Sequence, residues 1–390
     1  MAKVVVIGAG IIGASISRQL AQRGAQVTVL EAAAAPAQGA TKASWAWLNS
    51  NYKQPQHYKD FNIRSMQLWQ QQHSDLATFC GCLMLHDERP DPQDPAYPMA
   101  PVPAEQLLQL EPALSPELAA SASHARLFPA EGWCDPDEAT RSFLQDAQQL
   151  GAQVLLGHKV EAITIDDGKA TQVACSTSQP EQQQQQGSSY TADAVVVAAG
   201  TGCPELAAQA GCQLPLLHKP AAIVMTSPLQ PGLLRHMVIS DTVFMLQRRD
   251  GRVLLGETRP EEASNTDDSS SNAQRILALA AAAVPALASA GIEGIYIGYR
   301  PYPADGHPVL GWVGGGSSNV YVAVTHSGMT LAPLVGQLVA EEVMAAVGGG
   351  SRGSSSSSAS RLLAPYRPSR QFQVDGSGVR WADAAQAGTR

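Results

Sequence analysis

Residues 2–32 read AKVVVIGAGIIGASISRQLAQRGAQVTVLEA, and this stretch decides the expected fold. KVVVI is a continuous apolar run rich in β-branched residues, which is typical of a strand buried on both faces of a parallel sheet. A glycine turn, a helix-like segment and a second apolar run, QVTVLE, follow. This order predicts a strand, a helix and a second, parallel strand, which is the unit that opens many dinucleotide-binding folds.

The glycines of this unit form a GxGxxG motif at Gly8, Gly10 and Gly13. Gly8 permits the tight turn, Gly10 lets a pyrophosphate approach the backbone, and Gly13 lets the helix pack on the strand. Glu31 ends the second apolar run, where it would accept hydrogen bonds from a ribose hydroxyl. The alternative is that the glycines serve packing alone. Strand, helix, second strand and terminal acid all stand in the expected order, so we predict a dinucleotide site.

Length and charge bound the remaining possibilities. A chain of 390 residues can form two domains or one large interleaved unit, and 44% hydrophobic residues can build a substantial core. Lys and Arg number 26 against 34 Asp and Glu, which gives a net charge of -8. Phosphate binding depends mostly on cationic neutralisation, so nucleic acid and anionic membranes are not expected partners.

Location and redox state follow from the apolar runs and the cysteines. We expect no membrane span, because the sequence shows no apolar run that approaches the roughly 20 residues that crossing requires. The motif begins at Gly8, which leaves no room for a targeting peptide in this sequence. The six cysteines form no CxxC pair, so we expect reduced thiols in a cytoplasmic protein, and no zinc or other metal site. An organelle stays open if a transit peptide was removed.

Two later segments repeat the pattern of an apolar strand that ends in small residues. AVVVAAGTG at 194–202 ends in a turn of Ala and Gly, and VYVAVTHSGMT at 320–330 runs into an apolar helix at 331–347. The first free N–H groups of a helix point out of its start, so we expect an anion or a dipole to be held at the loop THSGMT.

Low-complexity segments interrupt the chain at two places. PEQQQQQGSS at 180–189 is expected to be a solvated loop within a hairpin. The Gly- and Ser-rich stretch at 348–360 has the composition of a flexible linker, and we expect residues 349–359 to be dispensable.

These segments together resemble the D-amino acid oxidase superfamily of FAD-dependent oxidoreductases, which includes glycine oxidase, sarcosine oxidase and D-amino acid dehydrogenases. The resemblance lies in residues 4–31, 194–202, 299–312 and 320–343, and LLAPYRPSRQF at 362–372 is similar to the usual ending of the family. It covers most of residues 1–372, with the middle matching only in outline.

The resemblance implies an α/β fold in which a Rossmann-like FAD-binding domain is interleaved with an α+β substrate domain built on a mixed antiparallel sheet. The expected boundaries are 1–50, 140–205 and 296–347 for the FAD-binding domain, 51–139 and 206–295 for the substrate domain, 348–360 for the linker and 361–390 for a C-terminal tail.

The implied cofactor is FAD, with its ADP half on the glycine motif and Glu31, and its flavin edge at the THSGMT loop. A helix start carries roughly half a positive charge, so it would stabilise reduced flavin, which is negative at that edge, more than oxidised flavin. The cofactor-binding residues expected on this basis are Gly8, Gly10, Ile11, Ile12, Gly13, Glu31, Ala32, Thr41, Ser44, Val160, Ala199, Gly200, Ser327, Gly328, Met329 and Thr330.

We expect the FAD to be bound non-covalently. Members of the superfamily with covalent flavin use a cysteine near the C-terminal motif or a histidine in the loop after the second strand. The last cysteine here is Cys212, and GATKASWAWLN at 39–49 contains no histidine.

Arg300 and His326 are the candidate catalytic residues. In glycine and D-amino acid oxidases the arginine of a stretch similar to YRPYPADGHP grips the substrate carboxylate, and a guanidinium can do so with two parallel hydrogen bonds. An ion-paired or surface arginine is the alternative for Arg300. His326 has either a structural or a chemical role. Trp45 and Trp47 could wall a pocket or belong to the core, and the sequence does not separate these.

The resemblance implies oxidation of the C–N bond of a small amino or N-methylamino acid, by hydride transfer to flavin N5. A non-amino-acid substrate and a flavin-binding protein without turnover stay open as alternatives. A NAD dehydrogenase or a methyltransferase would not explain the segments at 194–202 and 325–330. Sarcosine oxidases carry an oxygen-activating lysine in the strand resembling GRVLLGE, whereas no lysine follows Lys219, so the electron acceptor stays open.

Overall fold

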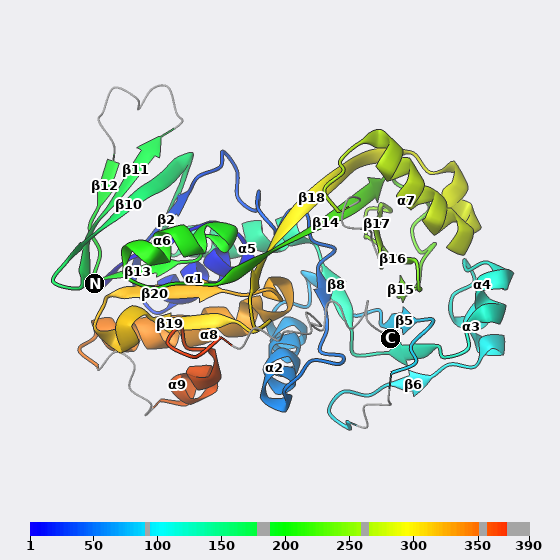
Figure 1. Cartoon of the computed structure of the whole chain (residues 1–390), viewed down its shortest axis with the longest axis horizontal. Helices are drawn as coiled ribbons and strands as arrows, with labels where there is room; N and C mark the ends of the chain where they lie inside the picture. Colours follow the sequence, from blue (N-terminus) through cyan, green and yellow to red (C-terminus); the bar gives the residue numbers. More distant parts are fainter. Residues whose placement is uncertain (90–93, 178–187, 259–264, 351–356, 373–390) are drawn as a thin grey trace. The chain divides into compact units, whose positions relative to one another are not determined.

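The computed structural model describes residues 1–89, 94–177, 188–258, 265–350 and 357–372. The chain divides into two compact units, and each is assembled from separate segments (Figure 1). The first unit consists of Met1–Lys42, Pro136–Lys219 and Arg300–Asp375. The second consists of Ala43–Asp135, Pro220–Tyr299 and Gly376–Arg390, the last of which lies outside the described residues. The chain therefore passes between the units several times.

A six-stranded sheet with the order β19-β20-β13-β1-β2-β9 forms the centre of the first unit. Its strands are β1 (Lys3–Ile7), β2 (Gln26–Glu31), β9 (Gln153–Leu156), β13 (Ala194–Val197), β19 (Val309–Trp312) and β20 (Val320–Val324). All neighbours pair parallel except β19, which is antiparallel to β20. The continuous Val and Ile runs are buried, as a sheet covered on both faces requires.

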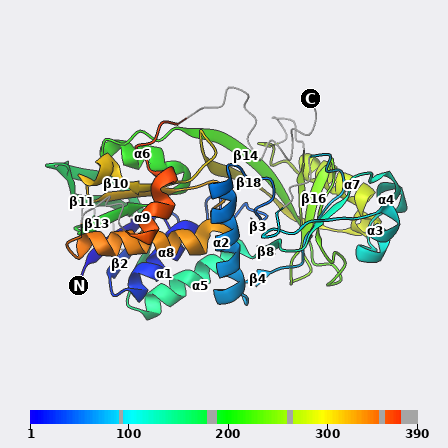
Figure 2. The ribbon, with the colours of Figure 1, turned by 90° about the horizontal axis from the view of Figure 1, so that it is seen from below.

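Helices cover one face of this sheet, where α1 (Ile11–Gln22), α5 (Pro136–Gln149) and α8 (Gly328–Val347) run side by side (Figure 2). The other face is covered by α6 (Cys203–Gln209) and a small antiparallel sheet, whose strands are β10 (His158–Asp166), β11 (Lys169–Thr177) and β12 (Ser188–Tyr190). Alternate residues of β1, Val5 and Ile7, belong to the core under that small sheet and α6. The predicted α/β architecture is confirmed.

The two helices α1 and α8 pack in unusually close contact. Ser15 Oγ of α1 donates a hydrogen bond of 2.7 Å to the Ala332 carbonyl of α8. A Cβ on Gly336 would lie 2.2 Å from Ser15 Oγ, so the approach requires glycine at this point. At the first turns, a Cβ on Gly328 would lie 3.7 Å from Ile11 and 3.6 Å from Ile12. The helices therefore run parallel and begin at the same edge of the sheet.

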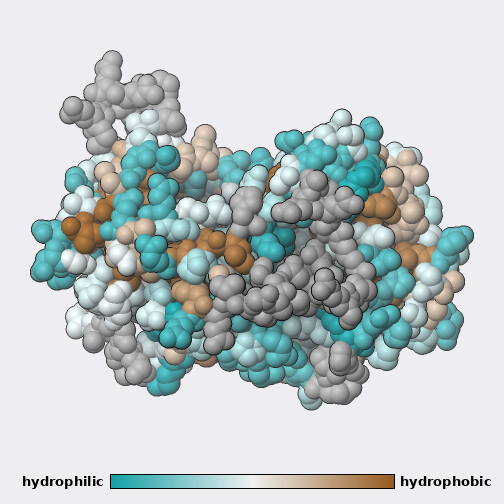
Figure 3. Space-filling view, in the orientation of Figure 1, coloured by the Kyte–Doolittle hydropathy of each residue, from teal (hydrophilic) through white to brown (hydrophobic). Residues whose placement is uncertain are grey.

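Helix α8 is longer and more apolar than the sequence analysis allowed for. It has 20 residues and a mean hydropathy of 1.3, enough by length and composition to cross a membrane. However, 72% of the apolar stretch of this helix is buried inside the protein, against α1 and β20. That arrangement is the one of a core helix. On the face drawn in Figure 3, hydrophobic residues form separate small patches among polar ones, as far as the coloured residues show.

The second unit is built on an eight-stranded mixed sheet with the order β18-β14-β17-β16-β15-β5-β7-β6. From β14 to β6 along this order, neighbours pair antiparallel except for the parallel pair β15 and β5, so the predicted mixed sheet is confirmed. The strands are β5 (Cys82–Met84), β6 (Ala100–Pro101), β7 (Arg126–Phe128), β14 (Leu216–Thr226), β15 (Met237–Ile239), β16 (Val243–Gln247), β17 (Val253–Glu257) and β18 (Ile292–Pro303). β14 and β18 each include residues of both units.

Among the described residues, a smaller sheet and four α-helices complete the second unit. The sheet has the order β3-β8-β4 and consists of β3 (Trp47–Leu48), β8 (Gly132–Cys134) and β4 (Ala77–Thr78). The helices are α2 (Gln56–Gln72), α3 (Ala104–Leu110), α4 (Pro116–Ser121) and α7 (Ser270–Ala283). One apolar cluster lies under α3, α4 and α7, and another lies between the two sheets.

The predicted linker at 348–360 extends too far. Helix α9 (Ser358–Leu363) begins inside it, and the Ser357 hydroxyl accepts a hydrogen bond from the backbone N–H of Ser360. Ala359 is fully buried. Residues 357–359 therefore belong to the folded structure, so the linker ends before Ser357. That residues 349–359 are dispensable stays a prediction. Residues 351–356 lie outside the described part of the chain, as do residues 178–187, which hold the glutamine tract.

We predict that Gly336→Ala destabilises the first unit by about 2 kcal/mol or more, because the new methyl group overpacks the contact between α1 and α8. Chemical denaturation measures the loss. Gly39→Ala is the matched control, since a Cβ on Gly39 would meet no atom of the described residues within 4 Å. Adding Ser15→Ala to Gly336→Ala should restore part of the stability, because it removes the atom nearest to the methyl. Equal stability of the two glycine variants would contradict the close contact.

Candidate functional site

The carboxyl ends of β1, β2, β13 and β20 lie at one edge of the central sheet, because these four strands run parallel. The turns that follow them start at Gly8, Ala32, Ala198 and Thr325. Ligands of open α/β sheets bind at this edge. The fold thus brings together three sequence segments that are far apart in the chain and that carry most of the predicted cofactor residues.

The glycine motif is shaped by close contacts. Gly8 has φ +106°, and a Cβ on it would lie 2.6 Å from the Ala198 carbonyl oxygen. A Cβ on Gly13 would lie 1.9 Å from the Gly8 carbonyl oxygen. Gly10 differs, because the nearest described neighbour of its Cβ position is Thr41 Oγ1 at 3.2 Å. Gly8 and Gly13 therefore allow strand, turn and helix to pack, while Gly10 keeps the turn open towards a ligand.

Glu31 closes the other side of this turn. Its carboxylate accepts hydrogen bonds from the backbone N–H of Ala9 at 2.7 Å and of Ala33 at 2.9 Å, one on each oxygen. A carboxylate has about four acceptor positions, so two remain for hydroxyl groups of a ligand. These two bonds hold the Glu31 carboxylate beside the glycine turn, and Ala32 lies between Glu31 and one of the donors.

Thr41 is placed at the same turn. Its hydroxyl oxygen accepts a hydrogen bond from the Ile11 N–H, the first residue of α1, at 3.3 Å. Ser44, which was predicted with it, belongs to the second unit, where its hydroxyl accepts a hydrogen bond from the Ala46 N–H at 3.0 Å.

The THSGMT loop starts α8 next to the start of α1. Ser327 occupies the N-cap position without a side-chain cap bond, and the side chains of Met329 and Thr330 are buried. The ligand-facing groups of this turn are therefore backbone N–H groups. Each helix start carries roughly +0.5 charge, so two such starts at one sheet edge favour an anionic ligand.

Thr325 supplies a further sign of a ligand at this edge. Its hydroxyl oxygen is buried and has no hydrogen-bond partner among the described residues. Buried polar groups are almost always hydrogen-bonded in folded proteins. An open glycine turn, two helix starts, a fixed carboxylate and an unsatisfied hydroxyl fit a dinucleotide cofactor with a polar ring system.

The remaining predicted cofactor residues border the same edge. Ala199 and Gly200 form the turn after β13, and Gly200 has φ +57°. Val160 lies in β10 beside an irregularity in its pairing with β11, and its side chain is buried in the core of the unit. Only the backbone of Val160 is thus left for a ligand.

Arg300 and His326 are linked through a residue that the sequence analysis did not single out. The Tyr302 ring is buried against the His326 ring, with centroids 4.5 Å apart. Arg300 is two residues earlier in β18, so its side chain leaves the strand on the same face as Tyr302. Arg300 Nε donates to the Lys219 carbonyl at 3.2 Å, which restrains the half-buried guanidinium. The period of two between Arg300 and Tyr302 was the available sequence signal.

The second unit contains a buried polar cluster that the sequence did not reveal. Glu131 is completely buried and accepts hydrogen bonds from Trp47 Nε1 and from the Tyr97 hydroxyl, each 2.6 Å long. Burial raises the pKa of Glu131 to about 8. Burial likewise lowers the pKa of Lys53, which is also completely buried and donates to the Asn49 carbonyl at 2.9 Å. Nothing in the loop PAEGWC distinguished Glu131 from an exposed acid.

The same cluster shows the surroundings of Trp45 and Trp47, which the sequence left undecided between a pocket wall and the core. Trp47 is tied to buried Glu131 through its indole N–H, so it is anchored in the core of the unit. Trp45 packs on Trp47 and on Phe244, with ring centroids 5.3 and 4.4 Å apart. Both tryptophans therefore belong to one cluster of packed aromatic side chains.

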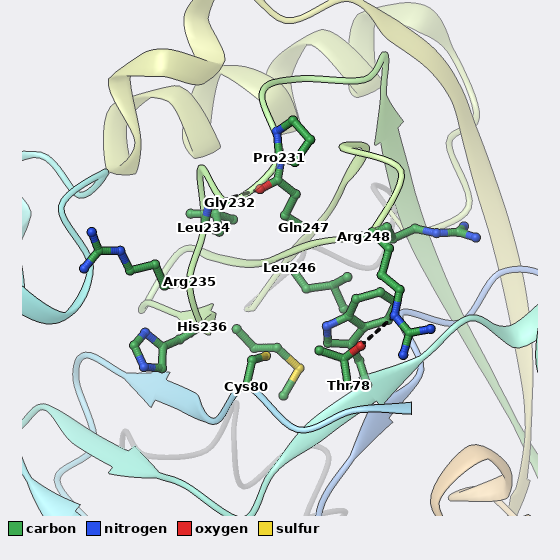
Figure 4. Close-up of a pocket in the computed structure, with 13 residues that line it drawn as sticks. Thr78, Cys80, Pro231, Gly232, Leu234, Arg235, His236, Leu246, Gln247 and Arg248 are labelled. Carbon is green, nitrogen blue, oxygen red and sulfur yellow. Dashed lines mark hydrogen bonds between the residues drawn. The ribbon is translucent and has the colours of Figure 1, made fainter. Parts of the chain in front are cut away.

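A cavity of about 180 Å³ lies elsewhere in the second unit, between the loop 231–237 and Trp133 (Figure 4). Its cationic side chains are engaged with the protein. Arg249 Nε donates to Thr78 Oγ1 at 3.1 Å, and Arg235 and His236 point away from the centre of the view. The cavity contains none of the predicted site residues.

Comparison with known proteins places the chain among flavoenzymes. Residues 3–342 match the profile of the protein family described as FAD dependent oxidoreductase. The bifunctional protein ThiO/ThiG of Synechocystis sp. is 27% identical over 358 residues, which cover 87% of this chain and 51% of that protein. The chain thus spans about half the length of that relative.

Two glycine oxidases are also similar to this chain. The glycine oxidase of Geobacillus kaustophilus is 24% identical over 363 residues, which cover 87% of this chain and 92% of the relative. The crystal structure of glycine oxidase from Bacillus cereus matches with a TM-score of 0.76 at 22% identity, covering 96% of this chain and 100% of that one. The structural likeness shows that the fold is shared.

We predict that Glu131 makes the stability of the protein fall with rising pH. The folded-state pKa is raised from the ordinary 4.5 to about 8, so the folded protein keeps a proton that the unfolded chain releases. This stabilisation is complete below about pH 4.5 and is lost as the pH rises through 8. Relative to Glu131→Gln, the wild-type free energy of unfolding should fall by up to about 1.4 kcal/mol per pH unit within this window.

Denaturant titrations at several pH values measure this difference. The glutamine oxygen can replace only one of the two acceptors, which adds a loss of stability that does not depend on pH. Glu117→Gln, at an exposed position of the same unit, is the matched control and should keep the wild-type slope. Equal slopes for Glu131→Gln and the wild type would show that Glu131 is ionised in the folded protein.

Proposed function

Because the chain belongs to the family of FAD-dependent oxidoreductases, we propose that it oxidises the C–N bond of a small amino acid or N-methylamino acid. The observation that carries this proposal is the convergence of the two helix starts, the glycine turn and Glu31 at one sheet edge, with Arg300 two residues from the tyrosine that packs on His326. The similarity to glycine oxidases supports the substrate class.

The ADP half of FAD is proposed to bind at the start of α1. The open side of Gly10 and the Ile12 N–H would face the pyrophosphate, beside the Ile11 N–H, which donates to Thr41 Oγ1. The remaining acceptor positions of Glu31 would face the ribose. Thr41 caps the same turn. Binding is proposed to be non-covalent, since Cys80, Cys82, Cys134, Cys175, Cys203 and Cys212 are free thiols and all precede the C-terminal motif. The FAD-binding segments are proposed to be those of the first unit, and the substrate segments those of the second.

The flavin edge is proposed to face the start of α8. Bound FAD supplies a ring that accepts a hydride and becomes negatively charged at its pyrimidine edge. The N–H groups of Gly328, Met329 and Thr330 would favour that charge, because they and the helix dipole are fixed before reaction. His326 and the buried Thr325 hydroxyl would orient this turn. Placement and exclusion of water are the protein's proposed contribution to catalysis.

Arg300 is proposed to anchor the substrate carboxylate. Its Nε donates to the Lys219 carbonyl, which restrains the guanidinium. A guanidinium can bind a carboxylate through two parallel hydrogen bonds. A carboxylate held at two points orients the α-carbon as well as binding it. A cytoplasmic location remains part of this proposal, in keeping with the free thiols.

We predict that Glu31→Ala lowers the affinity for FAD by about tenfold or more, because it removes charge-assisted hydrogen bonds worth roughly 1.5–3 kcal/mol. Acid precipitation should release the flavin into the supernatant, and apoprotein prepared under non-denaturing conditions is titrated with FAD. Glu161→Ala, an exposed acid on the small sheet of the same unit, is the control and should bind FAD normally. Unchanged affinity in Glu31→Ala would mean that the ribose binds elsewhere.

We predict that Arg300→Ala lowers kcat/KM for glycine or sarcosine by about 10- to 100-fold, because a carboxylate left unpaired in a partly dry site loses roughly 1.5–3 kcal/mol. Arg300→Lys should recover only part, since an ammonium group lacks the two-pronged geometry. FAD content should not change. Anaerobic flavin reduction by an amino acid and by the amine without a carboxylate is the deciding comparison. If Arg300→Ala slows both equally, Arg300 is not the carboxylate anchor.

A further inference from the structure

The C-terminal segment 357–372 is fastened to the first unit at two places. At the first, the Arg367 guanidinium binds the buried Glu342 carboxylate of α8, with a bond of 2.8 Å from Nη1. The Glu342 carboxylate also accepts hydrogen bonds from the Tyr321 and Ser360 hydroxyls. This cluster attaches the segment to α8 and β20 and supplies hydrogen-bond donors to the buried Glu342 carboxylate. Its role is structural.

The second attachment has a different character. Arg370 forms a two-pronged pair with Asp305, through Nε to Oδ2 at 2.7 Å and Nη2 to Oδ1 at 2.9 Å. Nη2 also donates to the His307 carbonyl at 3.2 Å, and the guanidinium lies 4.4 Å from the centroid of the Phe372 ring. The side chains of Arg370 and Asp305 are only 15% and 10% exposed. Arg370 therefore holds the turn 305–307 from outside the strand to which that turn belongs.

This turn covers Tyr302. Gly306 has φ +76°, and a Cβ on it would lie 3.4 Å from the Tyr302 hydroxyl oxygen. The Asp305 side chain accepts a hydrogen bond from the His307 N–H, and Gly306 N–H donates to the Pro303 carbonyl, so the turn is tightly closed. Tyr302 in turn packs on His326, directly before the start of α8. A continuous series of contacts leads from Arg370 to the THSGMT loop.

We propose that the Arg370–Asp305 pair is a positioning device that presses Tyr302 against His326 and so sets how strongly the start of α8 stabilises reduced FAD. The inference rests on the proposed function, which puts the flavin edge at this loop. Two helix-start N–H groups act on developing charge only when they are fixed in place before it appears. Loss of the pair loosens the turn over Tyr302, and the loop then rearranges at some cost when the flavin is reduced.

The test is the midpoint potential of bound FAD, measured by anaerobic reduction against a reference dye, which requires no knowledge of the substrate. Arg370→Ala should bind reduced FAD about tenfold less tightly relative to oxidised FAD, which lowers the potential by about 30 mV for a two-electron couple. Arg361→Ala is the matched control, since Arg361 is exposed on α9 in the same segment. It should leave the potential unchanged.

Asp305→Asn is the second variant, because asparagine keeps one oxygen for the His307 N–H and loses the charge and the second acceptor oxygen of the pair. It should shift the potential as Arg370→Ala does, and the double variant should add little, since both remove one interaction. A purely structural role would lower the melting temperature without moving the potential. That result would overturn the proposal.

His326→Ala separates failure of this inference from failure of the proposed function. If it shifts the potential while Arg370→Ala and Asp305→Asn do not, the flavin lies at the loop and the positioning role is wrong. If none of the three variants shifts the potential, the flavin edge lies elsewhere, and both the inference and that part of the proposed function are wrong. Shifts in all three, with none in Arg361→Ala, support the positioning role.

Discussion

The contact between α1 and α8 is the constraint on which the site depends. Ser15 donates to the Ala332 carbonyl, and Gly336 lets the two helices approach until their backbones nearly touch. This contact aligns the helices in parallel and puts both starts at one edge of the sheet. Two charges of about +0.5 at a typical interhelix spacing of about 10 Å repel by only about 0.4 kcal/mol at an effective dielectric constant of 20. Burial of a single leucine or valine outweighs that repulsion.

The two helix starts make one edge of the central sheet electropositive, and the Glu31 carboxylate at that edge is held in place. Glu31 is held by two backbone N–H groups, so its carboxylate stays beside the glycine turn and does not swing onto either helix start. We propose that N–H groups at the starts of α1 and α8 face the cofactor. An extended cofactor with a negative pyrophosphate and a ring that gains negative charge on reduction matches two separate helix starts better than a compact anion would. We therefore propose that the glycine turn serves cofactor binding and that the THSGMT loop serves redox chemistry.

The sequence predicts the parts of this arrangement that depend on local pattern. Continuous Val and Ile runs identify β1, β13 and β20, and glycine spacing identifies the turn, because each signal lies within a few residues. Composition misled at Ser357, where a serine-rich stretch contains a helix cap. The polar pairs that matter most were invisible for a related reason. Trp47 and Glu131 are 84 residues apart, and Asp305 and Arg370 are 65 apart, so neither pair leaves a periodic trace.

Buried charges in the two units illustrate two solutions to one problem. Glu342 is paired with Arg367 and accepts from two hydroxyls, and these partners keep its pKa below the usual range despite burial. Glu131 accepts hydrogen bonds from the neutral donors Trp47 and Tyr97, and desolvation has the largest effect on it, so its pKa rises to about 8. The comparison shows why the C-terminal segment matters beyond its length. Without Arg367, Glu342 would be desolvated without a cationic partner, as Glu131 is desolvated in the other unit. Glu342 lies in α8, the helix whose start is proposed to face the flavin. The two arginines of that segment thus act on α8 at two points. Arg367 pairs with its buried carboxylate, Glu342. Arg370 holds the turn next to Tyr302, which packs on His326 directly before the start of α8.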